Sequence, residues 1–72
     1  MTKYKFKFNI GDLVFILGRN GVCKITAFGV FTYSSGGTLK MYHVIGAHND
    51  IVPESLLLSF EEEKQLMRDS EL

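Results

Sequence analysis

Phe8-Asn9-Ile10-Gly11-Asp12-Leu13-Val14-Phe15-Ile16-Leu17 and the Gly18-Arg19-Asn20-Gly21 segment that follows it decide the fold class of this chain. Gly11-Asp12 predicts a bend, and the continuous apolar run over residues 13–17 predicts a short strand covered on both faces. Asn20-Gly21 favours a tight hairpin turn, because asparagine and glycine readily adopt positive φ. The stretch therefore predicts a turn, a buried strand and a hairpin, which is how a small, strongly bent β structure begins.

Four further segments have the alternation or the β-branched and aromatic composition of strands, namely residues 4–10, 22–33, 38–46 and 51–52. In the second of them we expect Cys23, Ile25 and Ala27 to face inward, because the opposite choice would bury Lys24. Gly29 indicates a bulge or a sharp bend within the same strand.

Residues 34–37, Ser-Ser-Gly-Gly, are expected to form a flexible hairpin tip between two long strands. In the return strand over residues 38–46, we expect His43 on the inward side. Pro53 ends the last strand, since proline cannot donate to a ladder.

A short helix is expected after the strands. Ser59 and Glu62 have the spacing of a capping box, and three consecutive acids suit the positive end of a helix dipole. The sequence therefore predicts a mainly β protein, an SH3-like five-stranded barrel over residues 1–58 with a short acidic C-terminal helix over residues 59–72.

Size and composition limit what this chain can be. Its 72 residues make one domain with a thin core. The single cysteine excludes an internal disulfide and fits a reducing compartment. The basic start is not followed by an apolar segment of signal-peptide type, and the longest apolar run is too short to span a bilayer. We therefore expect a cytoplasmic protein without a membrane anchor.

Charge is unevenly placed along a chain whose formal net charge is zero. Residues 1–24 carry a net +4, whereas residues 50–72 carry a net −5. Solvated faces are the simplest explanation, but a nucleic-acid-binding barrel is an alternative. In that alternative the phosphate contacts would come from the cations of the first strands: Lys5, Lys7, Arg19 and Lys24.

Cys23, His43 and His48 are the only soft metal-ligand candidates, and their spacing matches no standard zinc pattern. Cys23 with His43 lacks an orienting third group and an oxyanion hole, so nucleophilic catalysis is not supported. We expect no metal, no cofactor and no enzymatic activity.

The long hairpin over residues 28–42 is rich in aromatic side chains, which either complete the core or form a docking edge. A two-stranded arm with exposed aromatics is suited to binding a protein. On this interpretation the partner-binding residues are Phe31, Tyr33, Lys40, Tyr42 and Val44.

Residues 8–58 contain four short motifs: Phe8-x-Ile10-Gly11-Asp12-x-Val14, Gly21-Val22-x-x-Ile25, Tyr42-x-Val44 and Ile51-Val52-Pro53-x-x-x-Leu57. Together they resemble the RNA polymerase-interacting domain of the CarD family and of transcription-repair coupling factors. That resemblance implies an SH3-type, Tudor-like barrel that docks by an exposed strand edge on the β subunit of bacterial RNA polymerase. By analogy the docking edge would be the strand over residues 38–44. The loop over residues 17–21 departs from the family because it lacks a His-Gly pair.

Three functions are therefore weighed. The leading hypothesis is a non-catalytic adaptor that binds another protein, either the transcription machinery or, for a phage-encoded chain, a host factor. The second is the nucleic-acid-binding barrel, and the third is a structural protein that forms homo-oligomers through its sheet edge or its terminal helix.

Overall fold

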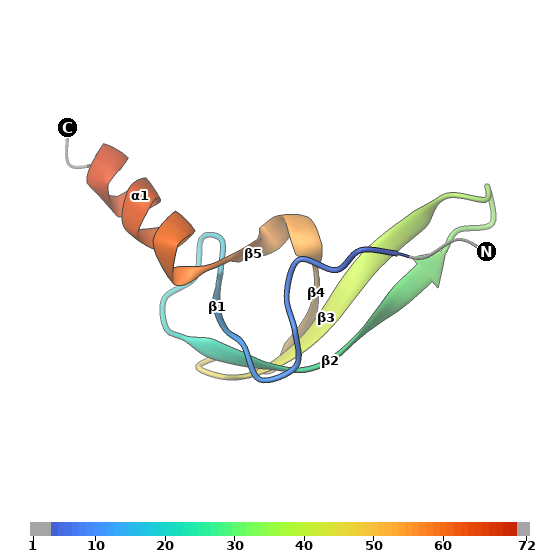
Figure 1. Ribbon diagram of the computed structural model, residues 1–72, viewed down its shortest axis with the longest axis horizontal. Coiled ribbons are helices and arrows are strands. Elements are labelled where there is room, and N and C mark those ends of the chain that lie inside the picture. The colour runs from blue at the N-terminus through green and yellow to red at the C-terminus, as the bar shows by residue number, and fades with distance from the viewer. Residues whose placement is uncertain (1–3, 71–72) are drawn as a thin grey trace.

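The computed structural model describes residues 4–70, with side chains placed over residues 4–66. One five-stranded antiparallel sheet and one short helix make up the protein, which confirms a mainly β fold (Figure 1). The sheet order is β4-β3-β2-β1-β5. The elements are β1 (Leu13–Ile16), β2 (Cys23–Thr32), β3 (Thr38–Gly46), β4 (Asp50–Pro53), the 3₁₀ turn η1 (Glu54–Leu56), β5 (Leu57–Leu58) and α1 (Phe60–Ser70).

The sheet is open, so the predicted closed barrel is not confirmed. β4 and β5 lie at its two ends, and over the described residues β4 pairs only with β3 and β5 only with β1. The turn η1 connects these two outer strands. The sheet bends around a core, but over residues 4–70 its two end strands, β4 and β5, are not paired with each other.

Residues 4–10 do not form the predicted first strand. This segment, the N-terminal strap, packs on the sheet through aromatic rings without joining a ladder, and the fifth strand is Leu57–Leu58 instead. The rings of Phe6 and Phe8 lie 6.0 and 5.7 Å from the ring of Tyr42. Phe6 and Phe8 therefore face the sheet without strand pairing, whereas Tyr4 and Ile10, which have the same alternation, are 46% and 64% exposed.

β2 contains a bulge, but not at Gly29, which pairs in regular register with Met41. The register with β3 shifts between Ile25 and Ala27, so the inward side changes at that point. Cys23 and Ile25 are buried as predicted, whereas Ala27 is exposed. The predicted inward position of Ala27 was therefore wrong, because the extra residue reverses the side chains that follow it.

The same register shift reverses which side chains of β3 face the core. Ala27 pairs with His43, and Phe28 pairs with Tyr42. His43 consequently lies on the outer side, contrary to the prediction, and Tyr42 and Val44 lie inside. The core consists of Phe8, Val14, Ile16, Cys23, Ile25, Tyr42, Val44, Val52 and Leu57.

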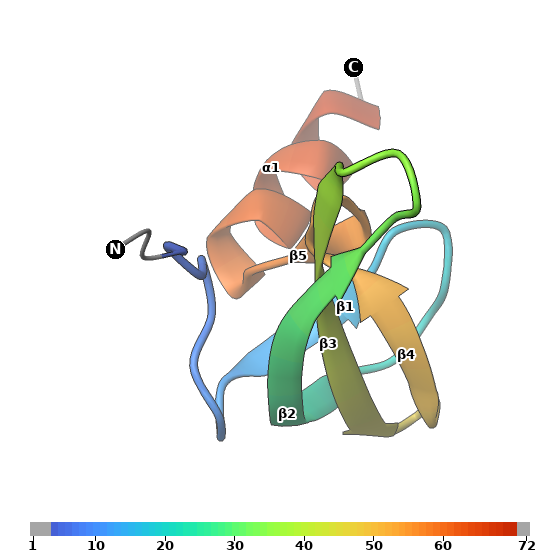
Figure 2. The same ribbon diagram turned by 90° about the vertical axis from the view of Figure 1, so that its right-hand side faces the viewer.

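The β2–β3 hairpin extends beyond the body of the protein (Figures 1 and 2). We call residues 28–40 the β-arm; within it β2 and β3 pair with each other, while β4 pairs with β3 only from Met41 onward. The arm contributes to the long dimension of a molecule that measures 43 × 25 × 20 Å.

α1 begins as the sequence predicted. The Ser59 N–H donates to Glu62 Oε1 at 3.0 Å, and the Glu62 N–H donates to Ser59 Oγ at 3.2 Å, which is a complete capping box. The ring of Phe60 packs edge-on against Phe15 at 5.1 Å. Residues 71 and 72 of the predicted 59–72 segment lie outside the described residues. In the part of the chain that the structure describes, neither helical segment has the length and apolar character needed to cross a membrane.

Candidate docking surfaces of the sheet

One face of the sheet is covered by the core and the other is not. Residues paired across antiparallel strands share a face, so the register defines the uncovered side. We call it the outer sheet face. It consists of Leu13, Lys24, Ala27, Gly29, Phe31, Leu39, Met41, His43, Ile45, Ile51 and Pro53.

The outer sheet face is apolar and partly hollowed. Phe31 and Ile51 are 54% and 53% exposed. A shallow hollow of about 240 Å³ lies between them, and Gly29 and Met41 contribute to its lining. A Cβ added at Gly29 would meet nothing within 4 Å, so the hollow has room for an incoming side chain. A contiguous apolar surface that stays exposed often marks a binding site.

Polar groups on the outer sheet face are few. His43 is already engaged, because its Nε2 lies 3.0 Å from Asn49 Oδ1 and its Nδ1 contacts the Thr26 hydroxyl. Lys24 is exposed and has no ion pair within the described part of the chain. The register places no carboxylate on this face over the described residues, so Lys24 gives it a positive bias.

The five residues predicted to bind a partner do not share one surface. Phe31 and Tyr33 are exposed at the β-arm, Tyr33 by 51%. Lys40 is half-buried, with its Nζ 3.9 Å from Glu54 Oε1. Tyr42 and Val44 are 0% exposed, so a partner could reach their side chains only by opening the core. Placing these two residues on a docking surface was wrong because the bulge in β2 fixes the opposite parity.

The predicted docking edge over residues 38–44 is only partly free. Residues 41–44 of β3 are paired with β2 on one side and β4 on the other. Residues 38–40 are paired with β2 alone. Over residues 4–70 the longer free edge belongs to β2, whose pairing with β1 ends at Lys24 and whose backbone after Ile25 bonds only to β3.

A sequence signal for the β2 edge exists. No charged residue occurs between Ile25 and Leu39, although most proteins protect a free edge with charges or proline. The sequence placed the docking edge on residues 38–44, and that assignment stays a prediction; the sheet order adds that β2 has the longer free edge.

A polar network fastens the N-terminal strap to the sheet. Glu54 Oε2 accepts hydrogen bonds from the Lys7 N–H at 3.0 Å and from the Tyr42 hydroxyl, and that hydroxyl accepts from the Phe8 N–H at 3.3 Å. Burial opposes ionisation of Glu54, but the bonds from Lys7 and Tyr42 outweigh it and hold its pKa below the ordinary value. Burial and the bond to Glu54 raise the pKa of Tyr42.

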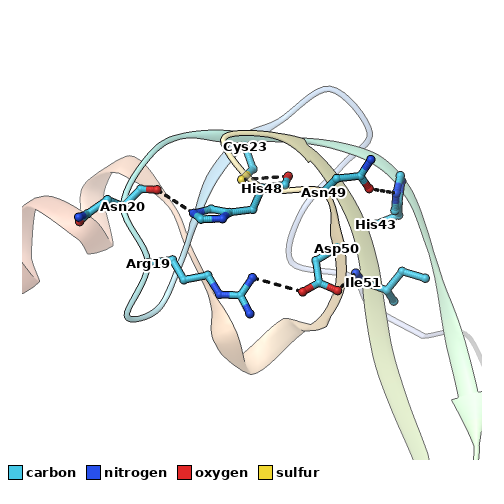
Figure 3. A network of polar contacts seen from close by, with 8 residues as sticks. All are labelled: Arg19, Asn20, Cys23, His43, His48, Asn49, Asp50 and Ile51. Atoms are coloured by element: carbon cyan, nitrogen blue, oxygen red, sulfur yellow. Dashed lines mark hydrogen bonds and ion pairs between the residues drawn. The ribbon is translucent and has the colours of Figure 1, made fainter.

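A second network joins the two turns at the far end of the sheet (Figure 3). Arg19 pairs with Asp50 at 3.2 Å, and His48 Nε2 lies 2.8 Å from the Asn20 carbonyl oxygen. Hydrogen bonds from the Ile51 N–H and from Arg19 lower the pKa of Asp50. These contacts connect turns that lie far apart in the sequence, which is a structural role.

Cys23 lies beside this network. Cys23 is buried, and its thiol faces the His48 carbonyl oxygen at 3.7 Å rather than an imidazole. Among the described residues no group of three potential ligands could hold a metal ion.

The four cations of the nucleic-acid alternative are not gathered into one patch. Lys7 pairs with Glu62 at 2.6 Å, and Arg19 pairs with Asp50. Lys24 lies on the outer sheet face, whereas Lys5 lies on the strap and is exposed. Two of the four charges are therefore already paired with carboxylates of this chain.

No protein-family model, curated protein or solved structure matches this chain.

Proposed function

We propose that this protein is a non-catalytic adaptor that binds another protein by adding a strand of that partner to the free edge of β2. The observation that carries the proposal is this edge: a β2 segment after Ile25 that is paired on one side only and is uncharged. Strand addition gives affinity through backbone hydrogen bonds and specificity through side chains that alternate along the edge.

Aromatic contacts would supply much of the specificity. Phe31 and Tyr33 are more than half exposed next to this edge, and aromatic anchors carry a large share of binding energy at protein interfaces. Phe6 of the strap packs on Phe28 at 4.5 Å, so the inner side of the arm is occupied by this chain itself. The partner would therefore contact the edge and the outer side of the β-arm.

The chemistry of the partner follows from this mode of binding. It presents an extended segment with an unpaired strand edge, such as the edge that the β subunit of bacterial RNA polymerase offers to the domains that this chain resembles. The sequence motifs over residues 8–58 support that partner in the cytoplasm. A host factor with a similar edge is the corresponding partner for a phage-encoded chain.

Val30→Glu tests strand addition. Val30 pairs with Lys40, so a carboxylate there faces an ammonium group and is compatible with folding. It also places a negative charge at the free edge, where charges disfavour pairing with another strand. Ser35→Glu is the matched control, because it adds the same charge at the exposed hairpin tip.

The binding of each variant to purified bacterial RNA polymerase is measured by biolayer interferometry. We expect the wild type and Ser35→Glu to bind alike and Val30→Glu to bind at least about tenfold more weakly, as for the loss of a central interface contact. Equal binding by all three would remove the β2 edge from the interface. If none bound the polymerase, that partner would be excluded, and the same three variants would be compared by affinity capture from host lysate.

A further inference from the structure

Two described contacts hold the first turn of α1 to the body: Phe60 packs on Phe15, and Glu62 pairs with Lys7. One full turn later, Leu66 is 48% exposed. An isolated helix of 11 residues is marginal in water, so its stability requires packing along an apolar side. Figure 1 shows the rest of α1 extending away from the body.

The outer sheet face has the complementary chemistry. Lys24 gives it one unpaired cation, and the described part of the chain places no carboxylate there. In α1, Glu63 lies three residues before Leu66 on the same side of the helix and has no ion pair described over residues 4–66. The helix therefore offers one acid and an exposed leucine where the face offers a cation and an apolar hollow.

Within one molecule, α1 cannot reach the hollow on the outer sheet face. α1 leaves the sheet from β5, at the end opposite the β-arm, as Figures 1 and 2 show. A helix of this length spans about 16 Å, and the part of β2 from Lys24 to Phe31 spans roughly 23 Å, so a helix from another molecule fits along the face.

We propose that two copies of this chain form a reciprocal dimer, in which α1 of each copy lies on the outer sheet face of the other. Leu66 enters the hollow beside Gly29, and Glu63, one turn earlier on the same side of the helix, faces Lys24 across the interface. Such a contact is two-fold symmetric and closes on itself. The zero net charge of the chain removes long-range repulsion between the copies.

This dimer goes beyond the proposed adaptor function, because it uses the outer sheet face and α1 rather than the backbone edge of β2, although both surfaces include Phe31. It forms without any other protein. Its failure is therefore visible without the polymerase, and Val30→Glu is expected to dimerise like the wild type.

Two substitutions probe the apolar contact from opposite sides. Leu66→Ala removes the inserted side chain, and Gly29→Leu fills the hollow; an added Cβ at Gly29 meets no neighbour in the same molecule. Sedimentation velocity over a wide range of concentrations measures the dimer dissociation constant, and far-UV circular dichroism verifies folding. We expect each variant to raise that constant at least about tenfold, as for the loss of one buried leucine.

Charge reversal tests whether the docking is reciprocal. Lys24→Glu and Glu63→Lys each create like-charge contacts at both sites of a homodimer, so each is expected to be monomeric. Mixing these two variants restores opposite charges at both sites, and a heterodimer is expected. Ser35→Glu, remote from both sites, serves as the control and should dimerise normally.

A wild type that stays monomeric at every concentration would overturn the proposal, whether or not the protein binds the polymerase. Dimerisation that persists in both Leu66→Ala and Gly29→Leu would show that copies associate elsewhere. Failure of the mixed charge variants to associate, with both correctly folded, would also contradict the reciprocal arrangement.

Discussion

Both faces of the sheet are apolar, but only the inner face is buried. On the inner face, Ile25, Tyr42 and Val44 are fully buried beneath the strap and the neighbouring strands. On the outer sheet face, Phe31 and Ile51 remain more than half exposed. A chain of this size can cover only one face of its sheet. The comparison teaches that apolar composition alone does not identify the core, and that the uncovered face and edge are available for binding.

The largest expected loss of stability comes from truncating a buried side chain of the inner face. Ile25→Ala removes a fully buried side chain and leaves a cavity, which should lower the free energy of unfolding by about 2–5 kcal/mol. Since small domains have little stability to lose, the variant should be largely unfolded at moderate urea concentrations. Urea denaturation followed by circular dichroism measures this. A loss below about 1 kcal/mol would show that the inner face is not the core.

The next effect comes from the network that fastens the strap. Tyr42→Phe keeps the ring but removes the hydroxyl that donates to Glu54 and accepts from the Phe8 N–H. Leaving the buried Phe8 N–H without its acceptor, and the half-buried Glu54 with one donor fewer, should cost about 1–3 kcal/mol of unfolding free energy. Thermal or urea unfolding of this variant beside the wild type gives the difference. Unchanged stability would mean that the strap is not held by this hydroxyl.

Low pH should weaken the contacts of Glu54 with the N-terminal strap and so lower the free energy of unfolding. The pKa of Glu54 is lower in the folded protein than its ordinary value of 4.5, so its contribution to stability is complete above that value. The contribution is lost as the pH falls through the lower folded pKa. We expect unfolding free energy measured by urea titration to decline below about pH 4.5, and Glu54→Gln to decline less over that range. Parallel curves for the two proteins would argue against this carboxylate.

The smallest effect on stability should come from the outer sheet face. Phe31→Ala truncates an exposed side chain and should change the free energy of unfolding by no more than about 0.5 kcal/mol. The same change should weaken partner binding about tenfold, because it removes an aromatic anchor. Parallel urea and biolayer measurements separate the two effects. A large loss of stability would mean that Phe31 belongs to the core after all.

Local features of this fold were predictable from sequence. Ser59 and Glu62 form the capping box because its contacts span only three residues and depend little on the rest of the chain. The two strands of the long hairpin and the turn between them followed from alternation and glycines.

Features that depend on distant pairing were not predictable in this way. The bulge between Ile25 and Ala27 is set by how β2 aligns with β3, and it decides that Tyr42 is inside and His43 outside. β5 exists only because Leu57 and Leu58 pair with β1, more than forty residues earlier. The candidate site inherited the same error: exposed Phe31 and Tyr33 were identified, whereas Tyr42 and Val44 were placed on the wrong side.

The central claim is that the inner face stabilises the fold, whereas the β-arm and the outer sheet face bind the partner. Site-specific photo-crosslinking tests it most directly, with a photoreactive phenylalanine derivative placed at Phe31 or, as a control, at Leu17, which is 46% exposed after β1. In native host lysate the Phe31 protein should form a discrete adduct with a polypeptide partner, and the Leu17 protein should not. Equal adducts from both positions, or none from Phe31, would contradict the account.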